Sequence, residues 1–282
     1  MNKEHIFEKL SKSFDLDVEI RRIDALFCSK FYFEEYGSFS RRIWYYPEKL
    51  VDEYCIFNWK QRKNCITCTD MRETLRIPRF DYVNHYTEDE VLTYLEYVEN
   101  ILFLCEEWRK NHSEIYVTEE YDMLIQNLSA VLDTLNLEVK YFEESQQAFV
   151  QEKNSIVNIV LETVEDNVAI DIVKYGHHML KGNLEEKRKI LAFLATEFEG
   201  MRKQLKNMRC NVEDDTGFLL NTFIRHNNDN KAYVQSLSDE ELENWYDRAY
   251  DLLMICFMQD KYLKNKNDIK ALKQKIAQKG KE

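Results

Sequence analysis

The residues whose side chains are best suited to catalysis or binding lie in the stretch 219–228, where an apolar helical turn runs directly into polar side chains. The polar part supplies a cation, an imidazole and two amides, from Arg225, His226, Asn227 and Asn228. Histidine is the side chain whose ordinary pKa lies closest to neutral pH, so it can gain or lose a proton under mild conditions. In an all-helical protein such a helix end is a candidate functional site.

The same residues are also typical of a helix that simply ends. Cations such as Arg225 and a protonated His226 are favoured at helix C-termini, where they interact with the helix dipole and the last carbonyl groups. Asn227 and Asn228 tolerate the left-handed backbone that often follows a helix. The sequence leaves both interpretations open.

A second candidate site combines cations with aromatic residues between positions 41 and 63. Successive bases of a single strand stack on aromatic rings while basic groups contact its phosphates. The alternative is that the aromatic residues form the core of a small helical subdomain and the cations its rim. The candidate RNA-binding cations are Arg41, Arg42, Lys60, Arg62 and Lys63.

Composition indicates a mainly α fold. The chain has 282 residues, which allows one large domain or two modest ones, but only 2 prolines and 6 glycines. Sheets joined by tight turns need more of both, whereas long helices need neither. We therefore expect two helical domains.

The formal net charge of −12 is unevenly distributed, because residues 261–282 carry 8 basic residues against 2 acidic ones. The acidic middle of the chain argues against phosphate binding there, and the basic end leaves room for it. Seven cysteines, an odd number, suggest free thiols in a reducing cytoplasm. No segment has the ~20 apolar residues of a membrane span, so we expect no membrane association.

Local signals place the elements. Capping boxes at Thr87–Glu90 and Ser238–Glu241, and an Asn183 cap, predict helix starts. Alternating apolar and polar residues at 137–153 predict the one β-hairpin. The predicted organisation is an aromatic-rich helical domain at 1–136, the hairpin as a connector at 137–153, an antiparallel four-helix bundle at 154–262 and a basic helical tail at 263–282.

Motifs for metal or cofactor chemistry are weak. Cys65 and Cys68 form a lone C-x-x-C without the second pair that a zinc site needs. His177 and His178 are adjacent, so they diverge on a helix, and a capping role is favoured. No glycine-rich phosphate-binding motif is present. We expect no cofactor and no metal site.

The predicted bundle, with Asn221, four intervening residues, His226, a polar loop and one long last helix, resembles HEPN domains. This resemblance covers about residues 154–262 and implies metal-independent RNA cleavage of the kind found in toxins and abortive-infection proteins. It would make His226 the base, Asn221 an orienting amide and Arg225 the phosphate-binding cation. The family's arginine position, however, is occupied by Leu220, which cannot stabilise negative charge.

Two functions follow. The first expectation is a non-catalytic, degenerate HEPN-like interaction module of a bacterial or phage-related defence protein, with a protein partner or self-association as a dimer. The alternative is a metal-independent ribonuclease that uses His226 with Arg225, either within one chain or across a two-fold axis. RNA is a possible ligand in both cases.

Overall fold

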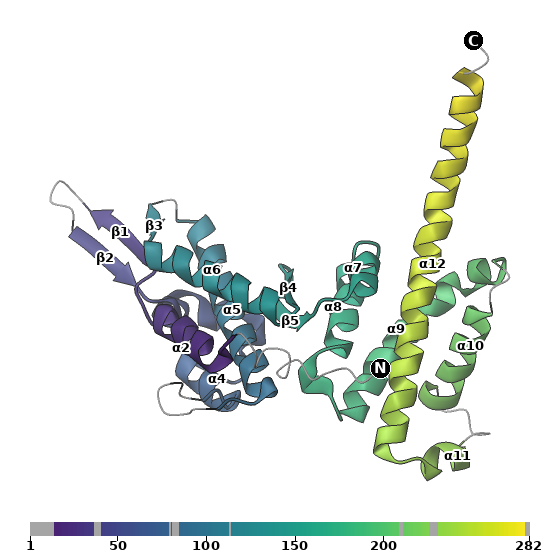
Figure 1. The fold of residues 1–282 in the computed structure, drawn as a ribbon, viewed down its shortest axis with the longest axis horizontal. Coiled ribbons are helices and arrows are strands. Elements are labelled where there is room, and N and C mark those ends of the chain that lie inside the picture. Colours follow the sequence, from purple (N-terminus) through teal and green to yellow (C-terminus); the bar gives the residue numbers. More distant parts are fainter. Residues whose placement is uncertain are drawn as a thin grey trace. The chain divides into compact units, whose positions relative to one another are not determined.

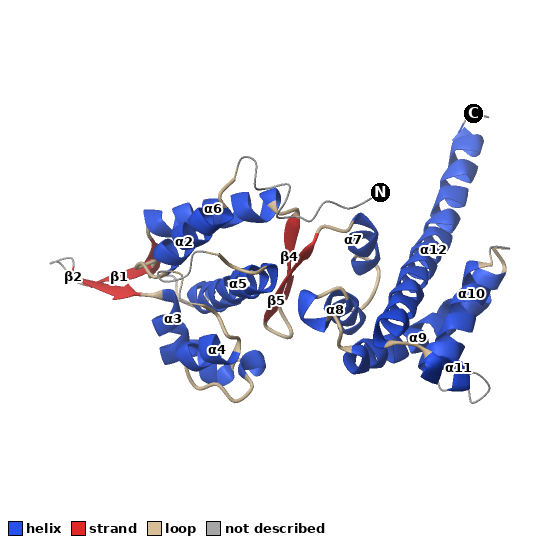
Figure 2. Ribbon diagram, turned by 60° about the horizontal axis from the view of Figure 1, so that its bottom comes forward, coloured by secondary structure: helices blue, strands red, loops and turns tan. Residues whose placement is uncertain are grey.

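The computed structural model describes residues 14–36, 41–78, 80, 85–112, 114–208, 211–225 and 231–279. The chain divides into two compact units, Met1–Lys153 and Asn154–Glu282. Each unit has its own hydrophobic core. The mainly α fold class predicted from composition is confirmed, and Figure 2 shows how few strands accompany the helices.

The first unit is built around helix α5, Glu88–Lys110, which has buried residues on most of its sides. A helix in this position must be apolar nearly all round, because other elements surround it. The other helical elements of this unit are α2 (Leu16–Phe27), α3 (Pro47–Leu50), η1 (Val51–Cys55), η2 (Ile56–Asn58), η3 (Lys60–Arg62), α4 (Cys68–Thr74) and α6 (Glu119–Thr134).

A three-stranded antiparallel sheet corrects the helical prediction for this unit. Strand β1 (Tyr32–Tyr36) lies between β2 (Arg41–Tyr45) and β3 (Ile115–Val117). The predicted helical domain at 1–136 did not include these strands, because β-branched and aromatic residues pair well across strands and this pairing is not visible in a local pattern. Tyr32 and Glu34 point inward and are buried, so Phe33 between them faces outward.

The predicted hairpin is confirmed as β4 (Leu137–Phe142) and β5 (Gln147–Glu152). It packs on α5 and is part of the first unit. The side chain of Asn100 on α5 fixes β5: its amide group donates to the Ala148 carbonyl at 2.8 Å and accepts from the Ala148 N–H at 2.9 Å. The buried carboxylate of Glu99 accepts a hydrogen bond from Tyr141 of β4.

The second unit contains all the predicted helical segments, with one break. The first helix of the predicted four-helix bundle, expected over 154–174, is interrupted after Leu161, because the backbone N–H and the hydroxyl of Thr163 both donate to the Val160 carbonyl and end the helix. The elements are α7 (Ser155–Leu161), α8 (Asp166–Tyr175), η4 (His178–Leu180), α9 (Leu184–Lys206), α10 (Val212–Leu219), η5 (Leu220–Ile224), α11 (Lys231–Ser236) and α12 (Asp239–Lys279).

The predicted helix starts are confirmed. Thr87 and Glu90 cap α5 reciprocally, and Ser238 and Glu241 do the same for α12. The side chain of Asn183 accepts from the N–H of Glu186 at the start of α9. These caps satisfy backbone donors that no helical carbonyl can reach.

Helix α12 is the longest element and packs on α7, α9 and α10. Residues 263–279, predicted as a separate tail, continue the same helix beyond the other helices of this unit (Figure 1). Near the start of α12, Glu243 and Asp247 each place a carboxylate oxygen 2.8 Å from Nζ of Lys187, a buried residue of α9. None of the helices in the described part of the chain is long and apolar enough to cross a membrane.

Candidate functional site

Arg225 lies at the end of the stretch in which the sequence concentrates polar chemistry. Helix α10 continues directly into the π-helix η5, and the backbone N–H of Arg225 donates to the Leu220 carbonyl and ends it. Short π-helical turns of this kind are frequent at functional sites. Leu220, at the position where the resemblance to HEPN domains would require an arginine, is fully buried in the core of the unit.

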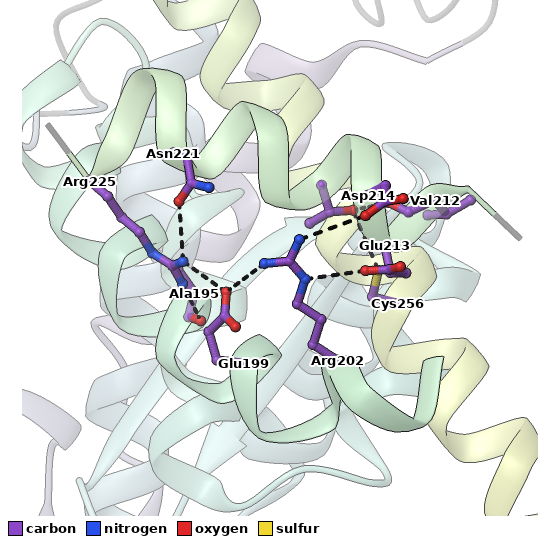
Figure 3. Close-up of polar contacts among 10 residues, drawn as sticks. Ala195, Glu199, Arg202, Val212, Glu213, Asp214, Asn221, Arg225 and Cys256 are labelled. Carbon is purple, nitrogen blue, oxygen red and sulfur yellow. Dashed lines mark hydrogen bonds and ion pairs between the residues drawn. The ribbon is translucent and has the colours of Figure 1, made fainter. Parts of the chain in front are cut away.

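The guanidinium of Arg225 folds back onto α9 (Figure 3). Its Nη1 donates to Glu199 Oε1 at 2.8 Å and to Asn221 Oδ1 at 3.3 Å, and its Nη2 donates to the Ala195 carbonyl at 3.0 Å. The predicted proximity of Arg225 and Asn221 is therefore present. The guanidinium is already engaged by three acceptors of its own chain, however, and its charge faces a carboxylate.

This contact is one end of a chain of alternating charges along α9 and α10. Glu199 also accepts from Arg202, whose Nε lies 3.2 Å from Glu213 and whose Nη2 lies 3.8 Å from Asp214. Burial opposes the ionisation of Glu199, but the hydrogen bonds and charges of Arg225 and Arg202 dominate and lower the pKa of its carboxyl group. The cluster thus pairs two guanidinium groups with three carboxylates, which is typical of a structural ion-pair network.

Gly217 makes room for this network. A Cβ atom at position 217 would lie 2.5 Å from Nη2 of Arg202, so a larger residue would require the guanidinium to move from its place beside α10. Sequence reasoning missed this arrangement. Its only signal is a glycine within an otherwise helical segment, where glycine is unfavourable and calls for a packing reason.

His226, the predicted base, lies outside the described residues, as do Asn227 and Asn228. Of the predicted catalytic set, the structure therefore brings together Asn221 and Arg225. The polar contacts described for these two residues are all with other groups of the protein.

The predicted RNA-binding cations fall into two groups on different elements of the first unit. Arg41 and Arg42 belong to β2, and nothing is described of the Arg41 side chain. Arg42 lies on the outward face of the sheet, where its Nε and Nη2 are both 2.9 Å from Glu35 Oε1. Its guanidinium carbon is 4.7 Å from the Phe33 ring centroid.

The second group serves the turn of the β4–β5 hairpin. Lys60 Nζ donates to the Glu144 carbonyl at 3.2 Å, next to Trp59, which donates to the Gln146 carbonyl at 2.7 Å. Arg62 donates to the Cys65 carbonyl, and Lys63 follows η3 with a left-handed backbone, φ 52°. These contacts satisfy loop carbonyls, which is a structural role.

The outward face of the three-stranded sheet carries a row of aromatic rings. The Phe33 ring lies between Trp44 on β2, with a centroid distance of 5.3 Å, and Tyr116 on β3, at 5.4 Å. Lys30 places its ammonium group 5.5 Å from the Trp44 ring. The sequence indicated the cation-and-aromatic character of β2 but not this row, because Phe33 and Tyr116 are far apart in the chain.

The cysteine and histidine motifs show no metal-binding geometry. Cys65 and Cys68 are buried thiols, and burial together with the Asp52 carboxylate raises the pKa of Cys68. His177 caps η4 by accepting from the Met179 N–H, in line with the predicted capping role. Within the described ranges, no three His, Cys, Asp or Glu side chains are grouped to hold a metal ion.

Helix α12 carries a second apolar face besides the one that packs in the core. Leu253, Cys256, Phe257 and Asp260 are buried on the side facing the other helices. A helix turns by ~100° per residue, so a further set of side chains lies roughly opposite this buried side. This stripe, called the outer stripe below, contains six exposed residues and the partly buried Met258, which packs against the core. The exposed members are Ile255, Tyr262, Asn265, Ile269, Leu272 and Ile276.

Searches of protein-family models, of curated protein sequences and of solved structures found no match to this chain.

Proposed function

We propose that this protein is a non-catalytic interaction protein whose second unit, HEPN-like in the arrangement of its sequence, associates with a second copy through the outer stripe of α12. Because the sequence resembles HEPN domains, the proposal includes a role in bacterial or phage-related defence. The observation that carries it is the outer stripe, an apolar face on a helix that already packs its opposite face in its own core.

The contacts of Arg225 support the non-catalytic part of the proposal. A ribonuclease of this type needs a cation free to stabilise the negative charge that develops on the phosphate. Arg225 instead bonds to Glu199, Asn221 and the Ala195 carbonyl, while the family's arginine position holds the buried Leu220. Three of the five guanidinium N–H donors of Arg225 are therefore used within the chain.

The spacing of the outer stripe matches a coiled coil. Its residues recur alternately at three and four positions, so Ile255, Tyr262, Ile269 and Ile276 occupy one heptad position and Met258, Asn265 and Leu272 the other. Ile269, Leu272 and Ile276 are about half exposed or more. A lone helical segment of this length is marginally stable in water, and a partner helix on the stripe would stabilise it.

The flanking charges favour a parallel pair of identical helices. In the parallel alignment, Asp268 of one copy faces Lys273 of the other, and the two-fold axis repeats this attraction, whereas Lys261 faces Lys266, so one of the two charged pairs is attractive. The antiparallel alignment that pairs the whole stripe would instead place Asp268 opposite Asp268 and Lys266 opposite Lys266. Asn265 would form a polar layer at the interface that fixes the register at some cost in stability.

The mass of the full chain in solution, measured by light scattering during size-exclusion chromatography, tests this proposal. We expect a dimer, a monomer for the double variant Ile269→Asp and Leu272→Asp, and a dimer for the matched control Ala271→Asp, whose site lies off the stripe. A monomeric wild-type chain across the accessible concentration range would refute self-association.

A charge exchange tests the orientation. Asp268→Lys and Lys273→Asp should each weaken the dimer, because each places like charges opposite one another across the parallel interface. Combining both substitutions in one chain should restore the dimer. Equal dissociation of all three variants would contradict the parallel alignment.

Incubation of single-stranded RNA with the wild-type chain and with His226→Ala separates this proposal from the ribonuclease alternative. We expect no cleavage above background by either. Metal-independent cleavage that His226→Ala abolishes would establish the alternative and overturn the non-catalytic assignment, whatever the oligomeric state.

A further inference from the structure

The outward face of the β2–β1–β3 sheet has an unusual composition for a solvated surface. When one face of an antiparallel sheet packs on a core, the other face is normally polar. Here the alternation buries Tyr32 and Glu34, and the register places Phe33 directly beside Trp44 and Tyr116 on the opposite face. Single exposed aromatic residues are common, but a continuous aromatic row across all three strands is typical of a binding surface.

The row is most accessible at its Tyr116 end. Tyr116 is about half exposed, while Phe33 and Trp44 are partly covered by their neighbours. The Phe33 and Tyr116 rings are stacked, with an angle of 26° between their planes. Two strand spacings of ~4.8 Å separate the outer members, a width that suits about two or three stacked bases.

Cations accompany the rings on the same face. The Lys30 ammonium group lies 5.5 Å from the Trp44 ring centroid and 6.0 Å from that of Tyr46. The Arg42 guanidinium lies over Phe33 and, at 5.9 Å, over Trp44. Both groups are exposed, so each can reach a phosphate without leaving the aromatic row.

We propose that this face binds single-stranded nucleic acid. One base stacks on the exposed Tyr116 ring, the adjoining bases lie along Phe33 and Trp44, and the phosphates between them pair with Lys30 and Arg42. This site is independent of α12 and of the interaction proposed for the second unit. It also differs from the site expected from the sequence, because Lys60, Arg62 and Lys63 follow strand β2 in other elements and take no part, and Lys60 and Arg62 bond to loop carbonyls.

Single strands fit this surface better than duplexes do. Stacking on protein rings requires unpaired bases, since paired bases present only their edges in the grooves. The row offers aromatic rings and two cations, which contact bases and phosphates without reading the edges of the bases. We therefore expect little preference among bases.

Glu35 gives the surface a built-in competitor for phosphate. Its carboxylate holds Arg42 through two nitrogen atoms at 2.9 Å, and both side chains are more than two-fifths exposed. A phosphate must replace this carboxylate to reach the full charge of Arg42. Removing the carboxylate charge with Glu35→Gln is therefore expected to tighten binding several-fold, an effect that no purely structural role of the face predicts.

Fluorescence anisotropy with labelled ten-nucleotide oligo(U) and oligo(dT), and with a labelled duplex of the same length, tests the proposal on the full chain. Both single strands should bind, and the duplex much more weakly. Tyr116→Ala should weaken binding by about 5- to 100-fold, the effect of losing one stacked base. The matched control is Phe57→Ala, an exposed ring that also carries an arginine, Arg62, at 5.7 Å.

Salt dependence gives a second readout. Two phosphate contacts predict that the logarithm of the binding constant falls with the logarithm of salt concentration with a slope of about −1.4 for a single strand. Equal losses for Tyr116→Ala and Phe57→Ala, unchanged or weaker binding by Glu35→Gln, or equal affinity for the duplex would overturn the proposal. So would absence of oligonucleotide binding at low salt, including a result in which the face binds a proline-rich peptide instead.

Discussion

Substitution of Gly217 by alanine gives a sharp test of the ion-pair network on α9 and α10. Two effects of opposite sign compete at this position. Alanine in place of glycine in a helix interior stabilises the helix by about 1 kcal/mol. The new Cβ, however, would lie 2.5 Å from Nη2 and 2.8 Å from Cζ of Arg202, so the guanidinium must move away.

The loss is larger than the gain because of the carboxylate that Arg202 leaves behind. The Glu213 side chain is only 6% exposed, and removing one partner of a buried ion pair costs about 3–5 kcal/mol. Arg202 is 24% exposed and can keep its outer contacts to Glu199 or Asp214. We therefore expect that moving its guanidinium lowers the free energy of unfolding by about 2–3 kcal/mol. The net expectation is a loss of about 1–2 kcal/mol in the free energy of unfolding.

The same substitution should change sign when Arg202 is absent. In an Arg202→Met background the conflict disappears, and Gly217→Ala should stabilise by about 1 kcal/mol through helix propensity alone. Denaturant titrations of the wild type, both single variants and the double variant measure this difference of about 2–3 kcal/mol between backgrounds. Stabilisation of the wild-type chain by Gly217→Ala would refute the reasoning.

Three further substitutions test contacts that hold each unit together. Burial raises the pKa of the Glu99 carboxyl group even though Tyr141 donates a hydrogen bond to it. The contribution of Glu99 to the free energy of unfolding therefore falls as the pH rises from the ordinary pKa through the raised one. In urea titrations, Glu99→Gln should be more stable than the wild type at pH 8 and similar to it at pH 4. Asn100→Ala should destabilise by about 2–3 kcal/mol and accelerate hydrogen exchange of the Ala148 amide, whose unchanged exchange would exclude the proposed clip. Lys187→Met should lower stability by about 2 kcal/mol, because two carboxylates then face each other, and neutralising both in the same chain should recover most of this loss.

The helices could be predicted where local signals coincide. The capping boxes at Thr87 and Ser238 and the cap at Asn183 act within one turn, so the residues that form them are neighbours in the sequence. The hairpin at 137–153 could be predicted for the same reason, since alternation and a short turn specify it locally. Its attachment to α5 through Asn100 could not, because the partners are 48 residues apart.

The three-stranded sheet was missed because its pairing is non-local. Its middle strand contacts β3 more than 75 residues later in the chain, and a strand of three residues such as β3 has almost no periodic signal of its own. The aromatic row could not be predicted for the same reason, because its rings come from all three strands. The sequence placed cations beside aromatic residues in β2, but only the register decides that Phe33 and Tyr116 complete the row.

By itself, the sequence determined a mainly helical chain with one hairpin and placed most helix starts, because caps and apolar periodicity are properties of adjacent residues. It also contained the heptad spacing of α12, which needs no partner to be visible. Only the tertiary structure decided that Arg225 turns back onto Glu199 and that Gly217 accommodates Arg202. It also decided which cations support a loop and which lie on an open face, because a charged side chain acts through the groups that packing brings within a few ångströms of it.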